Sequence, residues 1–596
     1  MGKISLSRRQ LSIILTIIAT ILFTHSLFYT KFEIGHFGLI DSLPTTFFAA
    51  LAFLTIASAI LWSSKEREGK LLLTQLLLFI GALWLIPAIT GGSPPFVNRI
   101  YYNLALVNHI AQEGSFSSGD IWYLSWPGAH IVLALLKVVG SFNYEPLVNI
   151  IPMLYILLFL LPLYFFLTNI LPKEQPNYAF AGLFLFCLGF WGAGGTSSSG
   201  QQVAFLLLLI ILALVTYPPL WQKEKGKVAL LLALGVLAIA TIPTHQLTSL
   251  AVVLILAALS LARRTMKILP IIGLCLVLMV VWDMTGGGNI ITNKVLSRPL
   301  WNAGTETPMP SAQAFPGSGE VKGEEGEELP FPEKERPSGI ITLNPKQIAE
   351  TEVTGHLRGS KSHIDVVKMR IIHSGIFSLI GLAGAIFVLF FRRKRETPSI
   401  LAMTLAPFLL LPISGNYGEE LLQRLYLFSL PFMAYFGAML LLIRSKLPIF
   451  ILSLLLLIAL PTRVIAHYGN QVLDYLPQSR IAAQKFFDST VSQGYVSGAL
   501  PLGYTSNLVN YIHLEYWQLG WQDSELYTAS EEGIPYYIAI SNRDYAWYGW
   551  FWGNYLYVGE IEQQLDNAVN CDLVYINPTI KLYQSEGTKL EDSESS

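Results

Sequence analysis

The run LSIILTIIATILFTHSLFY, residues 11–29, contains no Lys, Arg, Asp or Glu. About 20 apolar residues are enough for a helix to cross the hydrocarbon core of a bilayer. Lys3, Arg8 and Arg9 precede this run, and no small-residue cleavage site separates it from the next polar stretch. The pattern therefore predicts a retained first membrane helix and not a cleaved signal peptide.

Further apolar runs follow along the whole chain of 596 residues, which is 53% hydrophobic and only 13% charged. A soluble chain would carry nearer a quarter charged residues. The further runs cover residues 43–62, 71–90, 148–170, 178–192, 201–217, 228–243, 246–262, 268–283, 370–391, 398–414, 427–443 and 447–466. The sequence thus predicts a mainly α, polytopic membrane protein of about thirteen transmembrane helices.

Basic residues predict the orientation, because cytoplasmic loops carry an excess of Lys and Arg. With a cytoplasmic N-terminus, every compact basic cluster falls in a cytoplasmic loop. The clusters are Lys65, Arg67 and Lys70; Lys173; Lys223, Lys225 and Lys227; Arg263, Arg264 and Lys267; Arg392, Arg393, Lys394 and Arg395; and Arg444 and Lys446. This arrangement requires that the apolar segment Trp122–Val139 is a re-entrant or interfacial helix that does not cross fully.

The predicted organisation has five parts, and we expect the chain in a plasma (cytoplasmic) membrane. They are an N-terminal transmembrane hairpin (1–70), a membrane core with an outer loop and re-entrant helix at 91–147 (71–283), a long outer loop (284–369), C-terminal transmembrane helices (370–466) and an extracytoplasmic α/β domain (467–596). Within the long loop, residues 305–338 are dense in Pro, Gly and Glu, so we expect them to be mobile. In the last domain, Ser479–Ser492 has helical spacing, and Tyr495–Leu500, Tyr536–Ile540 and Leu573–Ile576 are predicted strands.

Net charge and cysteine spacing exclude several classes of function. The formal net charge is −1, which gives no basic surplus for nucleic acid. Cys187, Cys275 and Cys571 have no metal-type spacing, and the first two lie in apolar runs, so we expect no disulfide framework. No P-loop or dinucleotide fingerprint is present.

Polar residues of the first long outer loop are candidates for catalysis. Apolar spacing at Ile100, Leu104, Val107 and Ile110 predicts an interfacial helix. The candidate catalytic residues around it are Glu113, Asp120 and His130, and Arg99 is a candidate phosphate contact. His245, at the Pro243–His245 break between two runs, is either a buried hydrogen-bonding residue or a functional one.

Arg424 begins an apolar run at the outer side, one helical turn after Glu420. The two residues could pair with each other. Alternatively, the guanidinium could bind a lipid-linked phosphate while Glu419 and Glu420 hold a divalent cation. Trp547, Trp550 and Trp552 belong to a dense aromatic patch, which is typical either of a membrane interface or of stacking against sugars.

The order of these features resembles the GT-C superfamily of membrane glycosyltransferases, which includes oligosaccharyltransferases, protein mannosyltransferases and the lipid A aminoarabinose transferase. The resemblance rests on RIYYNLALVNHIAQEGSF (99–116), YLSWPGAHIVLALLKVVGSF (123–142) and NYGEELLQRLYLFSLP (416–431), followed by an outer C-terminal domain. It implies a polyprenyl-phosphate sugar donor, an acidic residue of the first outer loop as base, and Arg424 on the donor phosphate. Family members usually have an acidic residue just before the amphipathic helix, where this chain has Asn98 and Arg99.

The leading hypothesis is therefore transfer of a sugar from a polyprenyl-phosphate donor to an extracytoplasmic acceptor, with Asp120 as base and Arg424 on the leaving phosphate. A divalent cation is a possible cofactor. The partners expected are the lipid-linked sugar and the bilayer, and no nucleic acid. The alternatives are a flippase or transporter of lipid-linked saccharide, and a non-catalytic subunit of a cell-envelope assembly.

The predicted topology places everything after Ala466 outside the cytoplasm. Protease added to intact cells or right-side-out vesicles is therefore expected to remove a tag from the C-terminus. Protection of the tag until the membrane is opened would contradict this orientation.

Overall fold

The structure, a computed structural model, describes most of the membrane helices and part of the C-terminal region. The residues described are 6–30, 36–62, 64, 66–90, 92–95, 97–115, 125–192, 199–217, 224–285, 361–391, 397–413, 418–443, 446–470, 475–490, 494–498, 511–514, 536–546, 556–567, 571–577 and 579–585. The expected mobile stretch 305–338 lies outside them. The chain forms two compact units: Met1–Ala303 with Asp365–Gln471, called here the helical unit, and Gly304–Ile364 with Val472–Ser596, called the sheet unit.

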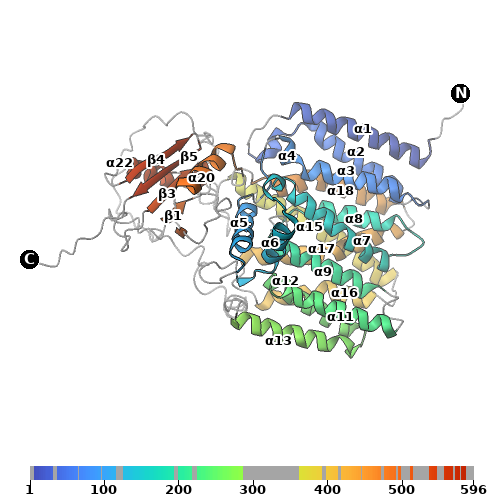
Figure 1. Cartoon of the computed structure of the whole chain (residues 1–596). Helices are drawn as coiled ribbons and strands as arrows, with labels where there is room; N and C mark the ends of the chain where they lie inside the picture. Colours follow the sequence, from blue (N-terminus) through green and yellow to red (C-terminus); the bar gives the residue numbers. More distant parts are fainter. Residues whose placement is uncertain are drawn as a thin grey trace, which may run out of the picture. The chain divides into compact units, whose positions relative to one another are not determined.

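The helical unit is a bundle whose long helices run side by side (Figure 1). Its α-helices are α1 (Arg8–Tyr29), α2 (Thr45–Trp62), α3 (Gly69–Trp84), α4 (Ile86–Thr90), α5 (Val97–Glu113), α6 (Gly128–Gly140), α7 (Ile151–Ile170), α8 (Tyr178–Gly189), α9 (Gly200–Thr216), α11 (Glu224–Thr241), α12 (Gln246–Ala262), α13 (Leu269–Thr285), α15 (Lys361–Phe391), α16 (Thr397–Leu405), α17 (Gly418–Met439) and α18 (Lys446–Tyr468). A 3-10 segment, η7 (Ala406–Ile413), continues α16.

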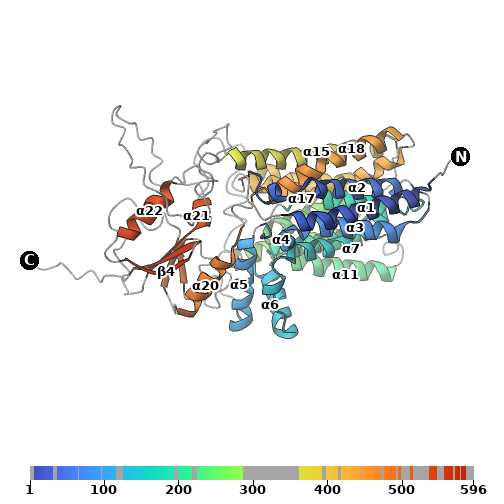
Figure 2. The ribbon, with the colours of Figure 1, turned by 90° about the horizontal axis from the view of Figure 1, so that it is seen from above.

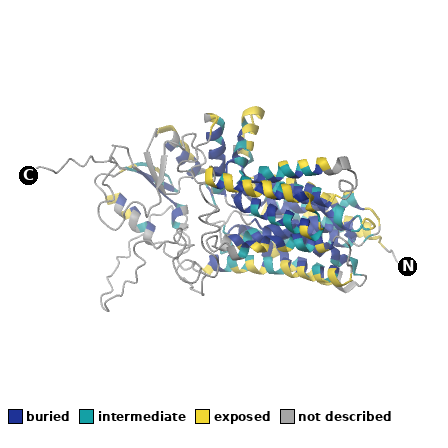
Figure 3. Ribbon diagram, turned by 90° about the horizontal axis from the view of Figure 1, so that it is seen from below, coloured by how far each residue is buried: buried dark blue, intermediate teal, exposed yellow. Residues whose placement is uncertain are grey.

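Each of the thirteen predicted spans coincides with one of these helices, and the mainly α fold class is confirmed. Within the described residues, 7 helical stretches are long and apolar enough to cross a membrane. The other predicted spans are shorter apolar helices, namely α3, α8, α9, α11, α12 and α16. Large apolar side chains on the outer helices are exposed, as Leu274, Val277 and Val281 of α13 are, and Figure 3 shows this exposed face. Such a face is suited to lipid.

α5 and α6 differ from the rest because they lie across the direction of the long helices in two perpendicular views (Figures 1 and 2). α6 has only 13 residues, and a helix of that length spans about 20 Å, less than a hydrocarbon core. The expectation that Trp122–Val139 does not cross fully stays a prediction, since residues 122–124 lie outside the described part of the chain.

Hydrogen bonds at helix ends define two ends of the helical unit. At one end the Tyr178 hydroxyl donates to the Leu441 carbonyl at 2.8 Å. At the other the Tyr468 hydroxyl donates to the Leu83 carbonyl at 2.5 Å, and the Tyr426 hydroxyl donates to the Gly189 carbonyl at 2.8 Å. We call the first end, where α1 begins at Arg8 and α3 begins at Gly69 just after Arg67, the basic end. The second is called the opposite end.

α1 is held to α2 and α3 by a buried polar network around Gln75. The Gln75 amide donates to the Ser12 and Thr16 hydroxyls, each at 2.8 Å, and accepts from the Ser58 hydroxyl at 3.1 Å. Ser12 in turn donates to the Ala57 carbonyl at 2.9 Å. Because every polar atom here has a partner, the network specifies how these helices pack without an unpaired buried group.

The sheet unit contains a five-stranded sheet in the order β2-β1-β3-β5-β4. Its strands are β1 (Gly494–Gly498), β2 (Tyr511–Leu514), β3 (Tyr536–Ser541), β4 (Cys571–Asn577) and β5 (Ile580–Ser585), and its helices are α20 (Gln478–Thr490), α21 (Asn542–Ala546) and α22 (Leu556–Asn567). β1 pairs in parallel with β2 and β3, whereas β5 runs antiparallel to β3 and β4. Ala483 and Phe487 of α20 pack on Ala539 and Leu582. The predicted helix and three strands are present, and β2, β5, α21 and α22 were not predicted.

Close packing of α15 on α17 depends on glycine. A Cβ built on Gly384 would lie 2.0 Å from the Phe436 carbonyl oxygen, whereas one on Gly375 of the same helix meets nothing within 4 Å. Small residues of this kind let membrane helices approach closely.

Gly384→Ala is therefore expected to lower the thermal unfolding midpoint of the purified protein in detergent, at a cost of about 1–3 kcal/mol for overpacking. Gly375→Ala is the matched control, because both changes give the same gain in helix propensity. Equal midpoints for the two variants would show that the helices do not meet at Gly384.

Candidate functional site

The turn Pro243–His245, between α11 and α12, gathers several helix ends at the opposite end of the helical unit. The Gly128 amide, at the start of α6, donates to the Pro243 carbonyl at 2.8 Å. A Cβ on Gly128 would lie 2.6 Å from the Thr244 hydroxyl, and one on Gly200, at the start of α9, would lie 2.0 Å from the Thr244 carbonyl oxygen. Only glycine allows the α6 and α9 backbones to approach this turn so closely.

His130 lies on the first turn of α6 and is buried against α5. Its Nε2 is 3.0 Å from the Asn103 side-chain oxygen. The Asn103 amide nitrogen already donates to the Arg99 carbonyl at 2.8 Å, so the Asn103 oxygen accepts and His130 Nε2 carries the hydrogen. In a neutral imidazole this leaves the lone pair on Nδ1. The sequence signal for His130 was its place two residues after the Pro127-Gly128 break.

Three buried polar atoms near this turn lack a hydrogen-bond partner in the structure as described. They are Trp126 Nε1, His130 Nδ1 and Gln201 Nε2. The three side chains are only 5%, 1% and 4% exposed. Leaving such a group unpaired costs about 1–3 kcal/mol, so each one is suited to a ligand or to a bound water. We call Trp126, Gly128, His130, Gln201, His245 and Arg424 the helix-break site.

His245 and Arg424 form the other side of the helix-break site. His245 caps α12, because its Nδ1 accepts from the Thr248 amide at 3.2 Å. Arg424, on α17, lies within electrostatic range of the His245 imidazole. Trp282 of α13 closes the site near α6, where its indole nitrogen donates to the Ser125 carbonyl at 3.1 Å. The arrangement thus places a cation beside a helix N-terminus, and both attract anions.

A second cluster, the buried-arginine cluster, surrounds Arg463 of α18 and comprises Trp84, His373, Tyr426, Arg463, His467 and Tyr468. Arg463 is 0% exposed, and none of its three guanidinium nitrogens has a hydrogen-bond partner among the described residues. The guanidinium lies over the Trp84 ring, 4.8 Å from its centroid. An ionised residue inside a membrane protein is costly and is by default a functional candidate.

Hydrogen bonds connect the buried-arginine cluster to the end of α8. His467 Nδ1 donates to the Trp191 carbonyl at 2.9 Å, and His373 Nε2 donates to the Leu188 carbonyl at 3.1 Å. Tyr426, which donates to Gly189, lies two residues after Arg424 on α17. The first turns of α17 therefore contribute one residue to the helix-break site and one to the buried-arginine cluster.

Gly128, two residues before His130, bonds to the Pro243–His245 turn, and Arg424 lies within electrostatic range of His245 in that turn. Arg99 lies one helical turn before Asn103 on α5. The backbones of Glu113, Glu419 and Glu420 lie in α5 and α17, but their side chains are not among those described. The other predicted site residues, Asp120, Trp547, Trp550 and Trp552, lie outside the described residues altogether. Within the searched part of the chain, no group of three or more His, Cys, Asp or Glu could hold a metal ion.

Sequence reasoning missed Arg463, His373 and His467. The available signal was a lone arginine within the apolar run 447–466, two residues after Pro461. That signal was weak because Arg463 is only a few residues from the end of its run, where a long side chain often extends to the membrane surface.

Comparison with known proteins gives structural likenesses only. Two structures of the Archaeoglobus fulgidus oligosaccharyltransferase are similar. The apo form has a TM-score of 0.42 and 12% sequence identity, and the match covers 85% of this chain and 70% of that one. The form tethered with an acceptor peptide containing the NVT sequon has a TM-score of 0.42 and 10% sequence identity, and the match covers 87% of this chain and 72% of that one. No family model and no curated protein matches the chain.

Replacing Arg463 with methionine is expected to stabilise the ligand-free protein, because three unpaired nitrogens cost about 1–3 kcal/mol each while stacking on Trp84 returns about 2 kcal/mol. Arg463→Met should raise the thermal unfolding midpoint, as replacement of other buried charges by apolar residues does.

Arg370→Met is the matched control with the opposite expected sign. Arg370 Nε donates to the Ala466 carbonyl at 3.0 Å, and its guanidinium lies 5.3 Å from the centroid of the Trp191 ring. Its removal should lower the midpoint. A lower midpoint for Arg463→Met as well would mean that the Arg463 charge is neutralised in the folded protein.

Proposed function

We propose that this protein is a membrane glycosyltransferase of GT-C type, which transfers a sugar from a polyprenyl-phosphate donor to an acceptor. The observation that carries the proposal is the helix-break site. There buried polar atoms of Trp126, His130 and Gln201 have no partner among the described residues, and Arg424 lies within electrostatic range of His245. A phosphate with a polar sugar attached can use both the cation and these polar atoms.

The position of the site supports a lipid-linked donor. α5 and α6 lie across the long helices (Figure 2), while exposed apolar side chains of α13, such as Val277 and Val281, face away from the bundle. A polyprenyl chain can remain in the bilayer beside the helices while its phosphate reaches polar residues at the helix ends. The layout of sequence motifs that resembles GT-C enzymes agrees with this arrangement.

The reaction needs a base and a stabiliser of the leaving group. The acceptor attacks the anomeric carbon, the bond from that carbon to the donor phosphate breaks, and the acceptor's proton passes to the base. Asp120 is the proposed base, with Glu113 and His130 Nδ1 as further candidates. Arg424 would stabilise the charge on the leaving phosphate, with Arg99 as a second candidate for that role. A divalent cation held by Glu419 and Glu420, and stacking of sugar on Trp547, Trp550 or Trp552, remain part of the proposal.

A flippase or transporter would call for charged residues from several helices around a central cavity. Within the described helical unit, Arg463 is the one Lys, Arg, Asp or Glu side chain that is 0% exposed, and it lies toward the opposite end rather than at a central cavity. We therefore favour group transfer over transport. A non-catalytic subunit that only binds lipid-linked glycan would use the same Arg424 contact without the base.

Arg424→Ala is expected to weaken binding of a polyprenyl-phosphate sugar by about 1.5–3 kcal/mol, the range for a hydrogen bond to a charged group, while the protein stays folded. The measurement is donor affinity together with the thermal unfolding midpoint. If Arg424 only pairs with Glu420, donor affinity should not change in Arg424→Ala. Glu420→Gln is measured beside it and should weaken donor binding only if Glu420 holds a divalent cation.

Lys368→Ala is the matched control, because Lys368 is also on a helix that begins at the opposite end and pairs there with Asp365 at 3.6 Å. It should bind donor as the unaltered protein does. Unchanged donor affinity in a folded Arg424→Ala protein would rule out Arg424 as the donor-phosphate contact. If Asp120→Asn loses sugar transfer but still binds donor, the protein is a transferase and not a non-catalytic subunit.

A further inference from the structure

A cavity of about 700 Å³ lies at the basic end of the helical unit, at the far end of the long helices from the helix-break site. It is lined by Arg9 at the start of α1, residues 66–71 at the start of α3, and Tyr164, Thr168 and Leu171 at the end of α7. The residues around the start of α8 that line it are Pro172, Lys173, Gln175, Pro176, Asn177, Ala179 and Phe180. None of the residues proposed for sugar transfer belongs to it.

The cavity carries an excess of positive charge. Its lining includes the cations Arg9, Arg67, Lys70 and Lys173 against the carboxylates Glu66 and Glu68, so the surplus is 4 − 2 = 2. Arg9 pairs with Glu68 at 3.6 Å. The described part of the chain offers no ion-pair partner for Arg67, Lys70 or Lys173. Cations that share a hollow without their own carboxylates are suited to binding an anion.

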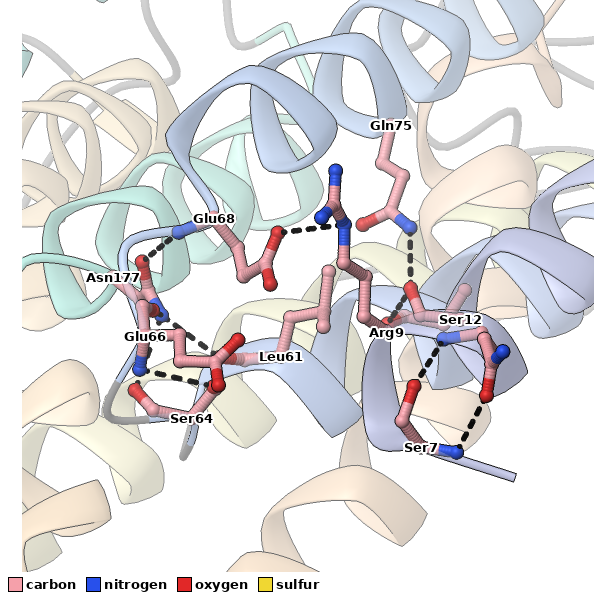
Figure 4. Close-up of polar contacts among 11 residues, drawn as sticks. Ser7, Arg9, Ser12, Leu61, Ser64, Glu66, Glu68, Gln75 and Asn177 are labelled. Atoms are coloured by element: carbon pink, nitrogen blue, oxygen red, sulfur yellow. Dashed lines mark hydrogen bonds and ion pairs between the residues drawn. The ribbon is translucent and has the colours of Figure 1, made fainter. Parts of the chain in front are cut away.

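The wall of the cavity is held rigid by Asn177, which is 1% exposed. Its amide nitrogen donates to the carbonyls of Leu61, Ser64 and Glu66 at 3.1, 3.2 and 2.8 Å, and its oxygen accepts from the Glu68 amide at 3.2 Å (Figure 4). One buried side chain thus binds the described residues of the α2–α3 connection, Ser64, Glu66 and Glu68, to the start of α8. A site that is already ordered loses less free energy when a ligand binds.

Apolar surface continues from the cavity along two helices. On α7, Leu158, Leu161 and Phe165 are 54%, 63% and 52% exposed and lie on the helical face that leads to Thr168. On α3, Leu73 and Leu77 are 44% and 45% exposed and follow Lys70 at helical spacing. α3 and α7 contact each other. A ligand that fits this arrangement has an anionic head and apolar chains.

We infer that this cavity binds the phosphate headgroup of an anionic phospholipid from the leaflet at the basic end, with its acyl chains along α3 and α7. Basic pockets between membrane helices are suited to such headgroups, and each Lys or Arg near the surface adds to the attraction. The site is separate from the proposed donor site, so either can fail without the other.

The experiment is binding of phosphatidic acid to the purified full-length protein in detergent, measured by native mass spectrometry, with phosphatidylcholine and inorganic phosphate as comparison ligands. Phosphatidic acid is expected to bind preferentially. The double variant Lys70→Gln with Lys173→Gln should bind it about thirtyfold more weakly, because two surface cations are removed. The matched control is Arg264→Gln with Lys267→Gln, which removes two cations of the same end outside the cavity and should keep the affinity.

A second variant tests the cavity without a change of charge. Thr168→Trp fills the space beside α7 and should also reduce phosphatidic acid binding, while the unfolding midpoint reports that the variant is folded. Equal losses in the cavity pair and the control pair would show general surface attraction and overturn the site. If inorganic phosphate displaces phosphatidic acid at equal concentration, the ligand is free phosphate and not a lipid. If Thr168→Trp binds phosphatidic acid as well as the unaltered protein does, the lipid does not bind in this cavity.

Discussion

The hydrogen bond from the Gly128 amide to the Pro243 carbonyl, 2.8 Å long, joins the start of α6 to a break between α11 and α12. Helices that end within an apolar unit leave amides and carbonyls that lipid cannot satisfy, so those groups must be paired by protein. Gly128 and Gly200 allow backbones to meet at this turn, and His245 caps α12 from it. The polar site exists because the starts of α6, α9 and α12 and the end of α11 all lie at this turn.

The two ends of the helical unit use charge in different ways. At the basic end, exposed Arg67, Lys70 and Lys173 surround a cavity open to solvated or headgroup anions. At the opposite end, the arginines of the two clusters are removed from solvent: Arg424 is partly buried and Arg463 is fully buried. A buried cation interacts with a ligand through a lower effective dielectric than a surface one, so few charges suffice. The same helices can therefore hold a structural lipid at one end and a reacting phosphate at the other.

Much of the fold could be predicted because a membrane helix is recognisable in sequence from the length and hydrophobicity of one apolar run. Each of the thirteen predicted runs contains a helix. The sheet unit was harder. β2 has only four residues, too few to show an alternating pattern. β5, Ile580–Ser585, does alternate apolar and polar residues, but it follows β4 so closely that the sequence does not distinguish a second strand of a hairpin from a loop. In the site, His130 could be predicted from the Pro-Gly break beside it. Arg463 could not, because its burial depends on Trp84 and Tyr468, which are distant in sequence from one another.

The central claim is that a lipid-linked sugar phosphate binds at the helix ends around Pro243–His245. Photocrosslinking with a polyprenyl-phosphate sugar that carries a photoreactive group on the sugar, followed by mass spectrometry of the labelled peptides, tests it directly. The account predicts labels within residues 125–130, 243–246 and 418–426. Labels confined to residues 66–71 and 172–177 at the basic end would contradict it.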